Sequence, residues 1–393
     1  MGESVKVCMV AYAQYTSDAR IKAYVRSIEN SGGTVDLLVL KEDGKPLMEA
    51  IGNSRVFYLT EKYQGGNPSR YILSYLKFFF VSLFRLSLLF LKEWYDVIHV
   101  HNMPNFLVYT AILPRFFGKK VILDVHDLMT VNYIVKFGLD EESLLIRCLR
   151  LEQKVSSWFA NWVLCADHMQ EKYLQEKCGI PEEKILVFMN LPHRELFKPV
   201  TKLEDNSKFR LVYHGTIAER LGIDLLLYAM ARIKDRIPVY LSIYGAGDYL
   251  ETAISIKEKL LLDDAVFFSK SFFPVEQIPK IVSNMDVGVV ANRKNLSTDK
   301  FMLPVKLMEY AYLQLPVIAP RLKIIQHYFT EDMLKYYEPE NVENLAKCIL
   351  ELYDNPDERR SLVANSQKFY DKYNWENQES AYLRLVNLAT QNL

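Results

Sequence analysis

The sequence predicts an α/β protein with two doubly wound parallel sheets, each in its own domain. Short apolar runs alternate with longer helical patterns along nearly the whole chain, as they do in βαβ units. The alternation stops once, in a polar segment with two prolines at 190–209 that is typical of a linker, and then restarts with the same design. The length of 393 residues exceeds one ordinary hydrophobic core and indicates two or three domains.

The apolar runs are the expected strands. In the first half they are VKVCMVAYA, TVDLLVL, RVFYL, DVIHVH, KKVILDVH, NWVLCA and KILVFMN. In the second half they are FRLVYHG, PVYLSIYGAG, AVFFSKS, DVGVVAN, LPVIAP and MLKYYEPE. A helix is expected at SDARIKAYVRSIENSGG, because Ser and Asp begin it and glycines end it. We expect a first domain over 1–195, a second over 196–373 facing it across a cleft, and a last helix over 374–393 that crosses back to the first.

The segment from Tyr71 to Trp94 is very apolar, but Lys77, Arg85 and Lys92 interrupt it. A membrane-spanning helix needs about 20 nearly uninterrupted apolar residues, and an arginine near its centre costs roughly 2.5–3.5 kcal/mol. A spanning helix is therefore disfavoured. A helix buried against a sheet is the favoured hypothesis, and an amphipathic helix lying on a lipid surface is the alternative.

The composition argues against several classes of protein. Lys plus Arg and Asp plus Glu each number 48, and this zero net charge argues against nucleic acid as the main partner. The five cysteines show no paired C-x-x-C spacing, so neither a disulfide framework nor a thiolate zinc site is expected. The N-terminal residues run straight into a strand without a basic segment or a cleavage site, so a signal peptide is not expected. The expected location is the reducing cytoplasm.

Ligands of open parallel sheets bind at the carboxyl ends of the strands, and polar residues follow several of the expected strands. One strand ends at His214, Gly215 and Thr216, and Arg220 lies in the short loop that follows. Gly215 permits close backbone approach, a helix N-terminus follows near Asp224, and Arg220 can fork onto phosphate oxygens. By itself this loop also fits an ordinary βα turn with a surface arginine.

Two further segments carry candidate ligand-binding residues, one directly after a strand and one at the start of a helix. Gly245 and Gly247 form a Gly-x-Gly turn, which alone is a common tight turn. A helix is expected to begin at Pro304, so that backbone N–H groups and the Lys306 ammonium lie at its N-terminal end. Glu309, one turn further, could accept hydrogen bonds from the vicinal hydroxyls of a sugar. A solvated Lys–Glu face is the alternative, but an unpaired carboxylate in an otherwise apolar helix is costly. The residues expected at this helix start are Pro304, Lys306, Leu307 and Glu309.

Taken together, these segments resemble the family 4 retaining glycosyltransferases, of the bacterial cell-surface polysaccharide type. In the second half the resemblance rests on HGT with ERLG, YGAG, NMDVGVV, LPVKLMEYAYLQLPVIAP and YNW. In the first half it rests on SDARIKAYVRSIENSGGTVDLLVL, DVIHVHNMP, VILDVHD, and CADHMQEKY with MNLPHRELFKP. The resemblance covers nearly the whole chain and implies the GT-B fold, in which two Rossmann-like domains face each other across a cleft.

The sequence departs from the family pattern at three places. Thr216 and Leu221 stand where members commonly carry Arg and Lys, so Arg220 is expected to supply the cation. Phe301 stands where many members carry the first Glu of an E-x7-E pair, whereas Glu309 matches the second. The loop after the first strand lacks the usual glycine pair. The residues expected at that edge instead are Tyr15, Thr16 and Ser17.

The resemblance also implies roles for further strand-end residues. His126 ends the strand in VILDVHD and matches the histidine that the family places near the donor sugar, although a core or turn histidine is the alternative. Ser271 and Phe272 resemble the edge that meets the nucleotide base. No Asp-x-Asp pair follows a strand, so no metal is implied, and Asp263–Asp264 fits turn chemistry.

The implied activity is hexosyl transfer from a nucleotide diphosphate sugar, with UDP-sugars favoured, to a glycan or lipid-linked acceptor, with retention and without a cofactor. Arg220, Lys306 and the N–H groups at 215–216 and 304–306 would stabilise the departing diphosphate, and Glu309 would hold the ribose. The leaving phosphate would help to deprotonate an acceptor bound near His126. A GT-B nucleotide-sugar 2-epimerase and a non-catalytic sugar-nucleotide-binding subunit are the alternatives. Peripheral contact with the inner face of the cytoplasmic membrane is a further expectation.

Overall fold

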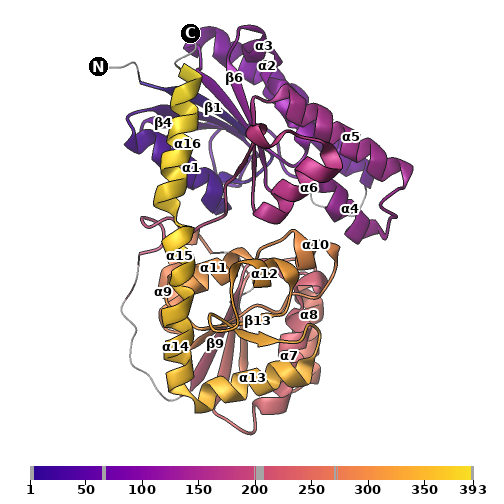
Figure 1. The fold of residues 1–393 in the computed structure, drawn as a ribbon, viewed down its shortest axis with the longest axis vertical. Helices are drawn as coiled ribbons and strands as arrows, with labels where there is room; N and C mark the ends of the chain where they lie inside the picture. Colours follow the sequence, from indigo (N-terminus) through magenta and orange to yellow (C-terminus); the bar gives the residue numbers. More distant parts are fainter. Residues whose placement is uncertain are drawn as a thin grey trace. The chain divides into compact units, whose positions relative to one another are not determined.

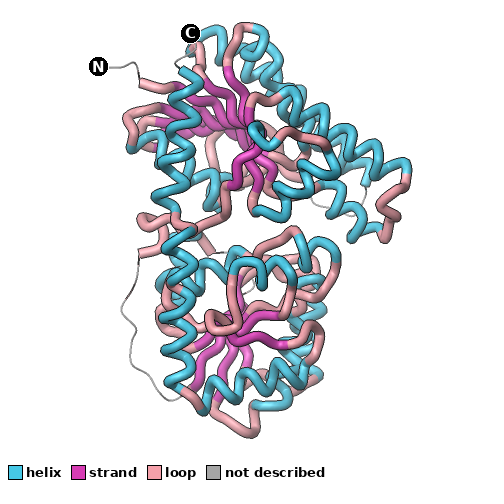
Figure 2. Tube along the Cα trace, in the orientation of Figure 1, coloured by secondary structure: helices cyan, strands magenta, loops and turns pink. Residues whose placement is uncertain are grey.

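The computed structural model of the chain describes residues 4–63, 68–198, 200, 208–269, 271 and 273–390 (Figure 1). It divides into two compact units, one made of residues 1–190 with 376–393 and one made of 191–375. The division follows Asn190, whereas the sequence placed it after residue 195. The last helix groups with the first unit. Each unit contains one sheet with helices along both of its faces (Figure 2).

The sheet of the first unit has eight strands in the order β3-β4-β2-β1-β5-β6-β7-β8. They are β1 (Lys6–Ala11), β2 (Thr34–Val39), β3 (Met48–Ile51), β4 (Ser54–Tyr58), β5 (Val97–His101), β6 (Lys120–Val125), β7 (Trp162–Cys165) and β8 (Ile185–Val187). All neighbours are parallel except β3 and β4. The sequence analysis missed β3, because its four residues are exposed or half-buried and form no apolar run. The strand order reverses at β1, so the switch point lies where β1 and β5 end.

The helices of the first unit cover both faces of this sheet. They are α1 (Ala19–Asn30), α2 (Pro68–Glu93), α3 (Ile112–Phe116), α4 (Met129–Phe137), α5 (Leu144–Phe159), α6 (His168–Cys178) and α16 (Trp375–Thr390), with 3-10 turns η1 (Tyr15–Ser17), η2 (Asn105–Ala111) and η3 (Glu182–Lys184). Asp18 caps α1 by accepting a 3.0 Å hydrogen bond from Ile21 N. Helix α16 lies along α1, where Ser27 Oγ donates a 2.6 Å hydrogen bond to Glu379 (Figure 1).

Helix α2 differs from the favoured hypothesis of a helix buried against a sheet. One stripe is buried, including Phe78, Leu86 and Phe90, each with no exposed surface. The rest is not: in the most apolar window of the helix, only 22% of the residues are buried. By length and composition alone, this is the one described helix that could cross a membrane. The hypothesis of a buried helix thus holds for one stripe of α2 only, because apolar periodicity does not show how many neighbours a helix has.

The sheet of the second unit has six parallel strands in the order β11-β10-β9-β12-β13-β14. They are β9 (Phe209–His214), β10 (Val239–Tyr244), β11 (Val266–Phe268), β12 (Val287–Val289), β13 (Val317–Pro320) and β14 (Lys335–Tyr337), and each coincides with an expected strand. The order reverses at β9, which lies between β10 and β12. The ligand-binding edge predicted for such a sheet is therefore where β9 and β12 end.

The helices of the second unit bury its core against this sheet, with α7 and α13 packed side by side. They are α7 (Ile223–Ile233), α8 (Leu250–Lys259), α9 (Ile278–Val282), α10 (Leu296–Lys300), α11 (Val305–Tyr312), α12 (Lys323–Tyr328), α13 (Val342–Asp354), α14 (Pro356–Ser366) and α15 (Lys368–Lys372), with 3-10 turns η4 (Glu219–Leu221) and η5 (Val275–Gln277). The loop that joins β9 to η4 and the start of α11 both lie at the carboxyl ends of strands, as the sequence predicts.

Candidate active site

The loop after β9 approaches the side chain of Lys306. Gly215 has a φ of +103°, a left-handed conformation that favours glycine, and a Cβ atom there would lie 3.8 Å from Lys306 Nζ. The Gly215 N–H donates a 2.9 Å hydrogen bond to the Tyr244 carbonyl. The Gly215 N–H is therefore already paired and is not available to a phosphate, contrary to the expectation from the sequence. Of the N–H groups expected at 215–216, that of the exposed Thr216 remains a candidate.

The Gly-x-Gly turn after β10 serves backbone packing. A Cβ atom at Gly245 would lie 1.9 Å from the carbonyl oxygen of Gly215, and one at Gly247 would lie 2.0 Å from that of Ile217. The two loops are joined by hydrogen bonds, including the 2.9 Å bond from Ile217 N to the Ala246 carbonyl. Glycine at 245 and 247 thus lets the loop after β10 support the loop after β9. A phosphate-binding role for the pair stays a prediction.

Helix α11 is anchored to the sheet by Tyr310. Its ring covers Gly288 of β12, where a Cβ atom would lie 2.3 Å from the ring. Its hydroxyl accepts a 3.0 Å hydrogen bond from His214 N at the end of β9. Because Pro304 caps the helix and α11 begins at Val305, Lys306 lies in its first turn, where backbone N–H groups lack intrahelical partners. Leu307 is fully buried below them.

Lys306 is the most unusual charged residue of the second unit. It is 9% exposed, and its Nζ has no hydrogen-bond acceptor among the residues that the structure describes. The Nζ instead lies 3.4 Å from the centre of the Tyr213 ring. Burial lowers the pKa of Lys306 to about 7, although the Glu309 carboxylate acts to raise it. A buried ammonium without an acceptor is a place where an anionic ligand gains a strong interaction.

Glu309 lies one turn after Lys306 and is 4% exposed. Its Oε2 is 3.1 Å from His214 Nε2, without the alignment of a hydrogen bond. The structure therefore brings together the end of β9 and the first turns of α11, with His214, Gly215, Lys306 and Glu309 as the polar lining. A carboxylate beside an imidazole can accept hydrogen bonds from ligand hydroxyls.

Arg220 is exposed on η4, and its guanidinium has no ion pair with any described residue. It is close enough to Tyr213 to oppose the rise in that residue's pKa that burial causes. The backbone of η4 is held by Arg293, whose N–H donates a 3.0 Å hydrogen bond to the Arg220 carbonyl. The neighbouring Gly222 has a φ of +65°, and a Cβ atom there would lie 2.0 Å from the Ala291 carbonyl oxygen, so this position requires glycine. Lys306 contacts the Tyr213 ring directly, and the charge of Arg220 acts on the same tyrosine from η4.

The sequence analysis missed Asn292, which follows β12 at the switch point. It is 1% exposed, and neither its Oδ1 nor its Nδ2 has a hydrogen-bond partner in the described part of the chain. Buried amides are normally paired, so Asn292 is a further candidate for ligand contact. The available signal was an asparagine directly after the apolar run DVGVVA.

The other proposed edge residues are less informative. Ser271 is exposed after β11, where its Oγ donates a 3.4 Å hydrogen bond to the Ser269 carbonyl, and Phe272 lies outside the described residues. Phe301 ends α10 and supplies no carboxylate. In the first unit, Thr16 of η1 is paired with Glu42, which accepts a 3.1 Å hydrogen bond from Thr16 N.

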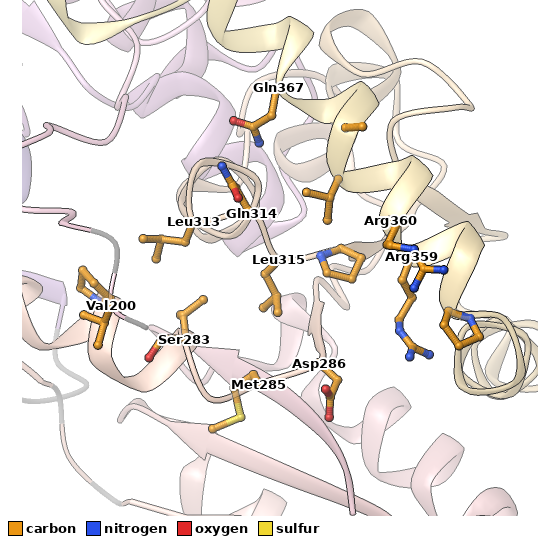
Figure 3. A pocket seen from close by; sticks show the side chains of 16 residues that line it. Val200, Ser283, Met285, Asp286, Leu313, Gln314, Leu315, Arg359, Arg360 and Gln367 are labelled. Atoms are coloured by element: carbon orange, nitrogen blue, oxygen red, sulfur yellow. The ribbon is translucent and has the colours of Figure 1, made fainter. Parts of the chain in front are cut away.

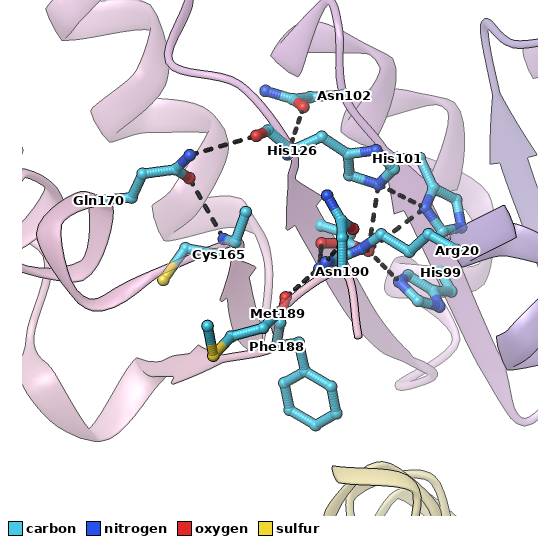
Figure 4. A network of polar contacts seen from close by, with 12 residues as sticks. Arg20, His99, His101, Asn102, His126, Cys165, Gln170, Phe188, Met189 and Asn190 are labelled. Atoms are coloured by element: carbon cyan, nitrogen blue, oxygen red, sulfur yellow. Dashed lines mark hydrogen bonds and ion pairs between the residues drawn. The ribbon is translucent and has the colours of Figure 1, made fainter. Parts of the chain in front are cut away.

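His126 belongs to a polar network at the carboxyl ends of β5 and β6 in the first unit (Figure 4). Its Nε2 is 3.2 Å from Asp124 Oδ2 and 3.1 Å from His101 Nδ1. Arg20 of α1 donates hydrogen bonds to both oxygens of Asp124, from Nε to Oδ2 at 2.8 Å and from Nη2 to Oδ1 at 2.5 Å. Burial alone would raise the pKa of Asp124, but Arg20 holds it well below its usual range.

The backbone around His126 is fixed by amide side chains. Asn102 Oδ1 accepts a 2.7 Å hydrogen bond from His126 N, and Gln170 Nε2 donates a 3.3 Å bond to the His126 carbonyl (Figure 4). The side chain of His126 is 20% exposed, whereas His99 and His101 are buried. His126 is therefore the histidine of this cluster that a ligand can reach. The sequence did not identify Arg20 or Asp124, although a carboxylate inside the apolar run VILDV demands a buried cation.

His99, His101 and Asp124 have ligand atoms within 4.8 Å of one another, as metal ligands do. The chemistry of the cluster does not fit a metal. Both oxygens of Asp124 already accept hydrogen bonds from the Arg20 guanidinium, which also places a fixed positive charge beside them. Burial lowers the pKa of His99 and of His101, so both imidazoles are neutral partners of this ion pair.

A cavity of about 630 Å³ lies elsewhere in the second unit (Figure 3). Met285, Asp286, Leu315 and Pro316 line it, so it lies at the amino ends of β12 and β13. Ligands of parallel sheets bind at the opposite edge. The cavity is therefore separate from the site formed by β9 and α11.

Two family models match the chain. Residues 20–190 match the model described as glycosyltransferase family 4, and residues 195–369 match the one described as glycosyl transferases group 1. The chitobiosyldiphosphodolichol beta-mannosyltransferase of Candida albicans is 20% identical over an alignment of 293 residues that covers 68% of this chain. The chain spans 62% of the length of that relative.

Solved structures of similar fold cover nearly the whole chain. Sucrose-phosphate synthase of Thermosynechococcus elongatus has a TM-score of 0.77 and 19% identity, over 98% of both chains. HepE of Anabaena in complex with UDP-glucose has a TM-score of 0.69 and 13% identity, over 97% of this chain and 99% of that one. These similarities establish the GT-B fold with its two Rossmann-like sheets, and the two adjoining family models show that the chain belongs to the family 4 glycosyltransferases.

Proposed function

We propose that the chain transfers a hexosyl residue from a nucleotide diphosphate sugar, with UDP-sugars favoured, to a glycan or lipid-linked acceptor. The transfer would retain the anomeric configuration, need no metal ion and serve the synthesis of bacterial surface polysaccharide or glycoconjugate. The observation that carries this proposal is the buried Lys306 ammonium, which faces Gly215 and has no hydrogen-bond acceptor among the described residues. A diphosphate at the end of β9 supplies that acceptor.

The leaving group determines what the site must do. As the bond between the anomeric carbon and the phosphate oxygen breaks, negative charge grows on the diphosphate and the glycosyl centre becomes oxocarbenium-like. Lys306, which lies over the Tyr213 ring, and Arg220 on η4 would supply two positive charges, and the first-turn N–H groups of α11 add dipoles of the same sign. Such donors are oriented before the reaction, so they stabilise the growing charge without reorganisation. Glu309 would accept hydrogen bonds from the ribose hydroxyls.

The acceptor is proposed to bind on the first unit, at the carboxyl ends of β5 and β6. His126 is the partly exposed histidine there, and Asp124 fixes its orientation from below. The leaving phosphate would accept the proton of the attacking hydroxyl as the new glycosidic bond forms. Two similar proteins support the two substrate classes: the HepE structure is a complex with UDP-glucose, and the name of the Candida albicans enzyme contains a diphosphodolichol-linked sugar.

The experiment is incubation of the purified chain with UDP-, GDP- and ADP-sugars, with and without polyisoprenyl diphosphate-linked acceptors. We expect acceptor-dependent release of the nucleoside diphosphate, with one base strongly preferred. Sugar isomerisation or release without acceptor would instead indicate a 2-epimerase, and binding without turnover would indicate a non-catalytic subunit. Nuclear magnetic resonance of the product reports the anomeric configuration, and an inverted product would overturn the retaining mechanism. The anomeric configuration needs to be measured directly, because the name of the Candida albicans relative specifies a beta linkage.

A further inference from the structure

Helix α2 of the first unit exposes a continuous apolar stripe. Its members recur every three or four residues, so they lie on one side of the helix. They are Leu73, Leu76, Phe80, Phe84, Leu88 and Leu91, each between 39% and 67% exposed. The opposite side of the same helix is buried at Phe78, Leu86 and Phe90. An ordinary surface helix has one apolar side, whereas α2 has two.

An aromatic cluster with exposed rings lies at the C-terminal end of α2. Trp94 is 48% exposed and stacks on Phe90 at 4.9 Å between ring centres. It also meets Phe117 at 5.5 Å, and Phe117 meets Phe116, which is 83% exposed. We call the stripe together with Trp94, Phe116 and Phe117 the apolar face. An apolar surface of this extent on a soluble unit marks a place of contact with another molecule or with lipid.

The charged residues of α2 are mostly basic. Helix α2 carries four basic residues and one acidic residue, although the whole chain has zero net charge. The acidic residue, Glu93, is already paired with Arg55 at 3.0 Å. The Arg85 guanidinium lies 4.8 Å from the centre of the Phe57 ring and so packs within the unit. Lys77 and Lys92 are exposed. Arg70, Lys77 and Lys92 are therefore the basic side chains of α2 that stay exposed, and they suit an anionic surface.

We propose that the apolar face docks the first unit onto an anionic lipid bilayer, with α2 lying in the plane of the interface. Exposed Phe, Trp and Leu side chains would enter the acyl boundary while the lysines meet the headgroups, as in other interfacial helices. A helix in the interface plane keeps its buried stripe against the sheet, whereas a spanning helix would lose it. A second copy of the chain is a poorer occupant, because an isologous contact would bring the same lysines together.

The apolar face also adjoins the carboxyl edge of the sheet. Tyr12, which directly follows β1, forms a 2.6 Å hydrogen bond between its hydroxyl and Ser74 of α2. The ring of Tyr12 also contacts Tyr75 of α2 at 4.7 Å. A bilayer under α2 would thus lie next to the switch point of the first unit. The inference that the bilayer brings a lipid-linked acceptor to this edge rests on the proposed function.

Vesicle flotation tests the docking without any activity. The wild type is expected to float with vesicles of phosphatidylglycerol and phosphatidylcholine, and less with phosphatidylcholine alone. The variant Phe80→Gln/Phe84→Gln/Leu91→Gln keeps helix propensity, removes three exposed apolar side chains, and is expected to lower partitioning by about tenfold or more. Lys77→Glu/Lys92→Glu is expected to lower partitioning onto the anionic vesicles by about tenfold or more and to abolish the preference for them.

Matched controls make the same chemical changes elsewhere. Lys259→Glu/Lys280→Glu reverses two exposed lysines of the second unit, and Leu47→Gln/Phe267→Gln/Leu388→Gln removes three other exposed apolar side chains. Both controls should float like the wild type. Absence of wild-type flotation on the anionic vesicles, or equal loss in the controls, would overturn the proposal. So would a wild-type dimer in solution that Phe80→Gln/Phe84→Gln/Leu91→Gln converts to a monomer without any vesicle binding.

Trp94 gives a second measurement that needs no change to the stripe. Lipids brominated in their acyl chains should quench the tryptophan fluorescence of the wild type. Trp94→Phe should remove a large part of that quenching while flotation persists, because Phe still enters the interface. Quenching that is unchanged in Trp94→Phe would place another face of the protein on the bilayer and contradict the proposal.

Discussion

The Lys306 ammonium lies 3.4 Å from the centre of the Tyr213 ring and has no hydrogen-bond acceptor in the described part of the chain. The aromatic face stabilises the cation less than a hydrogen-bonded carboxylate would, and burial therefore lowers the pKa of Lys306 to about 7. An incoming diphosphate would be the first anion to accept a hydrogen bond from this group. Donor binding and protonation of Lys306 are therefore coupled.

The first prediction is that nucleotide binding takes up a proton above pH 7. A bound diphosphate raises the pKa of Lys306, because an opposite charge favours the protonated form. Between the free value of about 7 and the higher bound value, binding adds up to one proton, so the Kd for UDP should rise up to about tenfold per pH unit. Isothermal titration at pH 8 in buffers of different ionisation enthalpy measures the proton directly.

The variant Lys306→Met keeps the length of the side chain and removes its charge. It should bind UDP more weakly than the wild type at pH 6.5 and show no proton uptake linked to this position. Turnover should fall by about 10²–10³, the scale of losing one donor that stabilises a developing charge. An unchanged pH slope in Lys306→Met would assign the coupling to another group and remove Lys306 from the donor site.

The second prediction concerns Arg220, which is exposed on η4 and has no ion pair among the described residues. Arg220→Ala should lower turnover by about 10²–10³ and leave the melting temperature unchanged, because no described contact of the guanidinium is lost. EDTA should have little effect on the wild type. If EDTA abolishes activity and added Mn²⁺ or Mg²⁺ restores it, the leaving group is not stabilised by Lys306 and Arg220 alone.

The third prediction concerns Glu309, whose carboxylate lies 3.1 Å from His214. Glu309→Gln keeps the shape of the side chain but removes the charge, so kcat/KM for the donor should fall about 10- to 100-fold, as expected when a hydrogen bond to a charged group is lost. Glu309→Ala should nearly abolish donor use. Glu343→Gln is the matched control, because Glu343 is an exposed helical glutamate of the same unit paired with Arg232. Near wild-type kcat/KM in Glu309→Ala would refute the donor-site assignment.

The fourth prediction separates packing from ligand contact at the Gly-x-Gly turn. Gly245→Ala would place a Cβ atom 1.9 Å from the Gly215 carbonyl, so the two loops must move apart. We expect a loss of about 1–3 kcal/mol in the free energy of unfolding of the second unit even without nucleotide. Gly44→Ala is the control, since its Cβ would meet nothing within 4 Å and only its φ of +74° is strained. A Gly245→Ala protein of normal stability that only binds UDP poorly would favour direct phosphate contact instead.

The strands and the ligand-binding edge of the second unit could be predicted from the sequence. Buried parallel strands are continuous apolar runs, and the residue after each run is fixed at one edge of the sheet, as Gly215 is after β9. Lys306 reaches the same edge from the first turn of α11, whose start the sequence also predicted. What the runs could not show was the pairing of individual atoms. The Gly215 N–H is donated to Tyr244, and Gly245 packs on a carbonyl, because two loops distant in sequence meet there.

The less predictable features depend on contacts between distant segments. Arg20 and Asp124 are 104 positions apart. Neither the helical pattern around Arg20 nor the apolar run around Asp124 shows that the two residues pair. The short strand β3 pairs antiparallel with β4 at the edge of the sheet, so it needs no apolar run. The exposure of α2 depends on how much of its surface the neighbouring elements cover, and hydropathy along the helix does not contain that information.

The fifth prediction concerns the ion pair of Arg20 and Asp124, whose side chains are 5% and 0% exposed. Arg20→Met would leave the Asp124 carboxylate buried without its cation, which should cost the first unit about 3–5 kcal/mol at pH 7. The double variant Arg20→Met/Asp124→Asn removes both charges and should cost clearly less than the sum of the single variants. Unfolding by urea, with the free energies compared in a double-mutant cycle, measures the coupling.

The pH dependence of this pair distinguishes a charge effect from lost packing. In the wild type the pKa of Asp124 is held well below its usual range, so the stabilisation is present above the unfolded value of about 3.9 and is lost as pH falls below it. In Arg20→Met, burial raises the pKa of Asp124 above the unfolded value, and stability increases as pH falls towards 4. The gap between wild type and Arg20→Met should therefore shrink on acidification. In the Asp124→Asn background there is no carboxylate to titrate, so the stability lost on Arg20→Met should not depend on pH in this range. If the stability lost on Arg20→Met is also independent of pH when Asp124 is present, the effect of the substitution is one of packing alone.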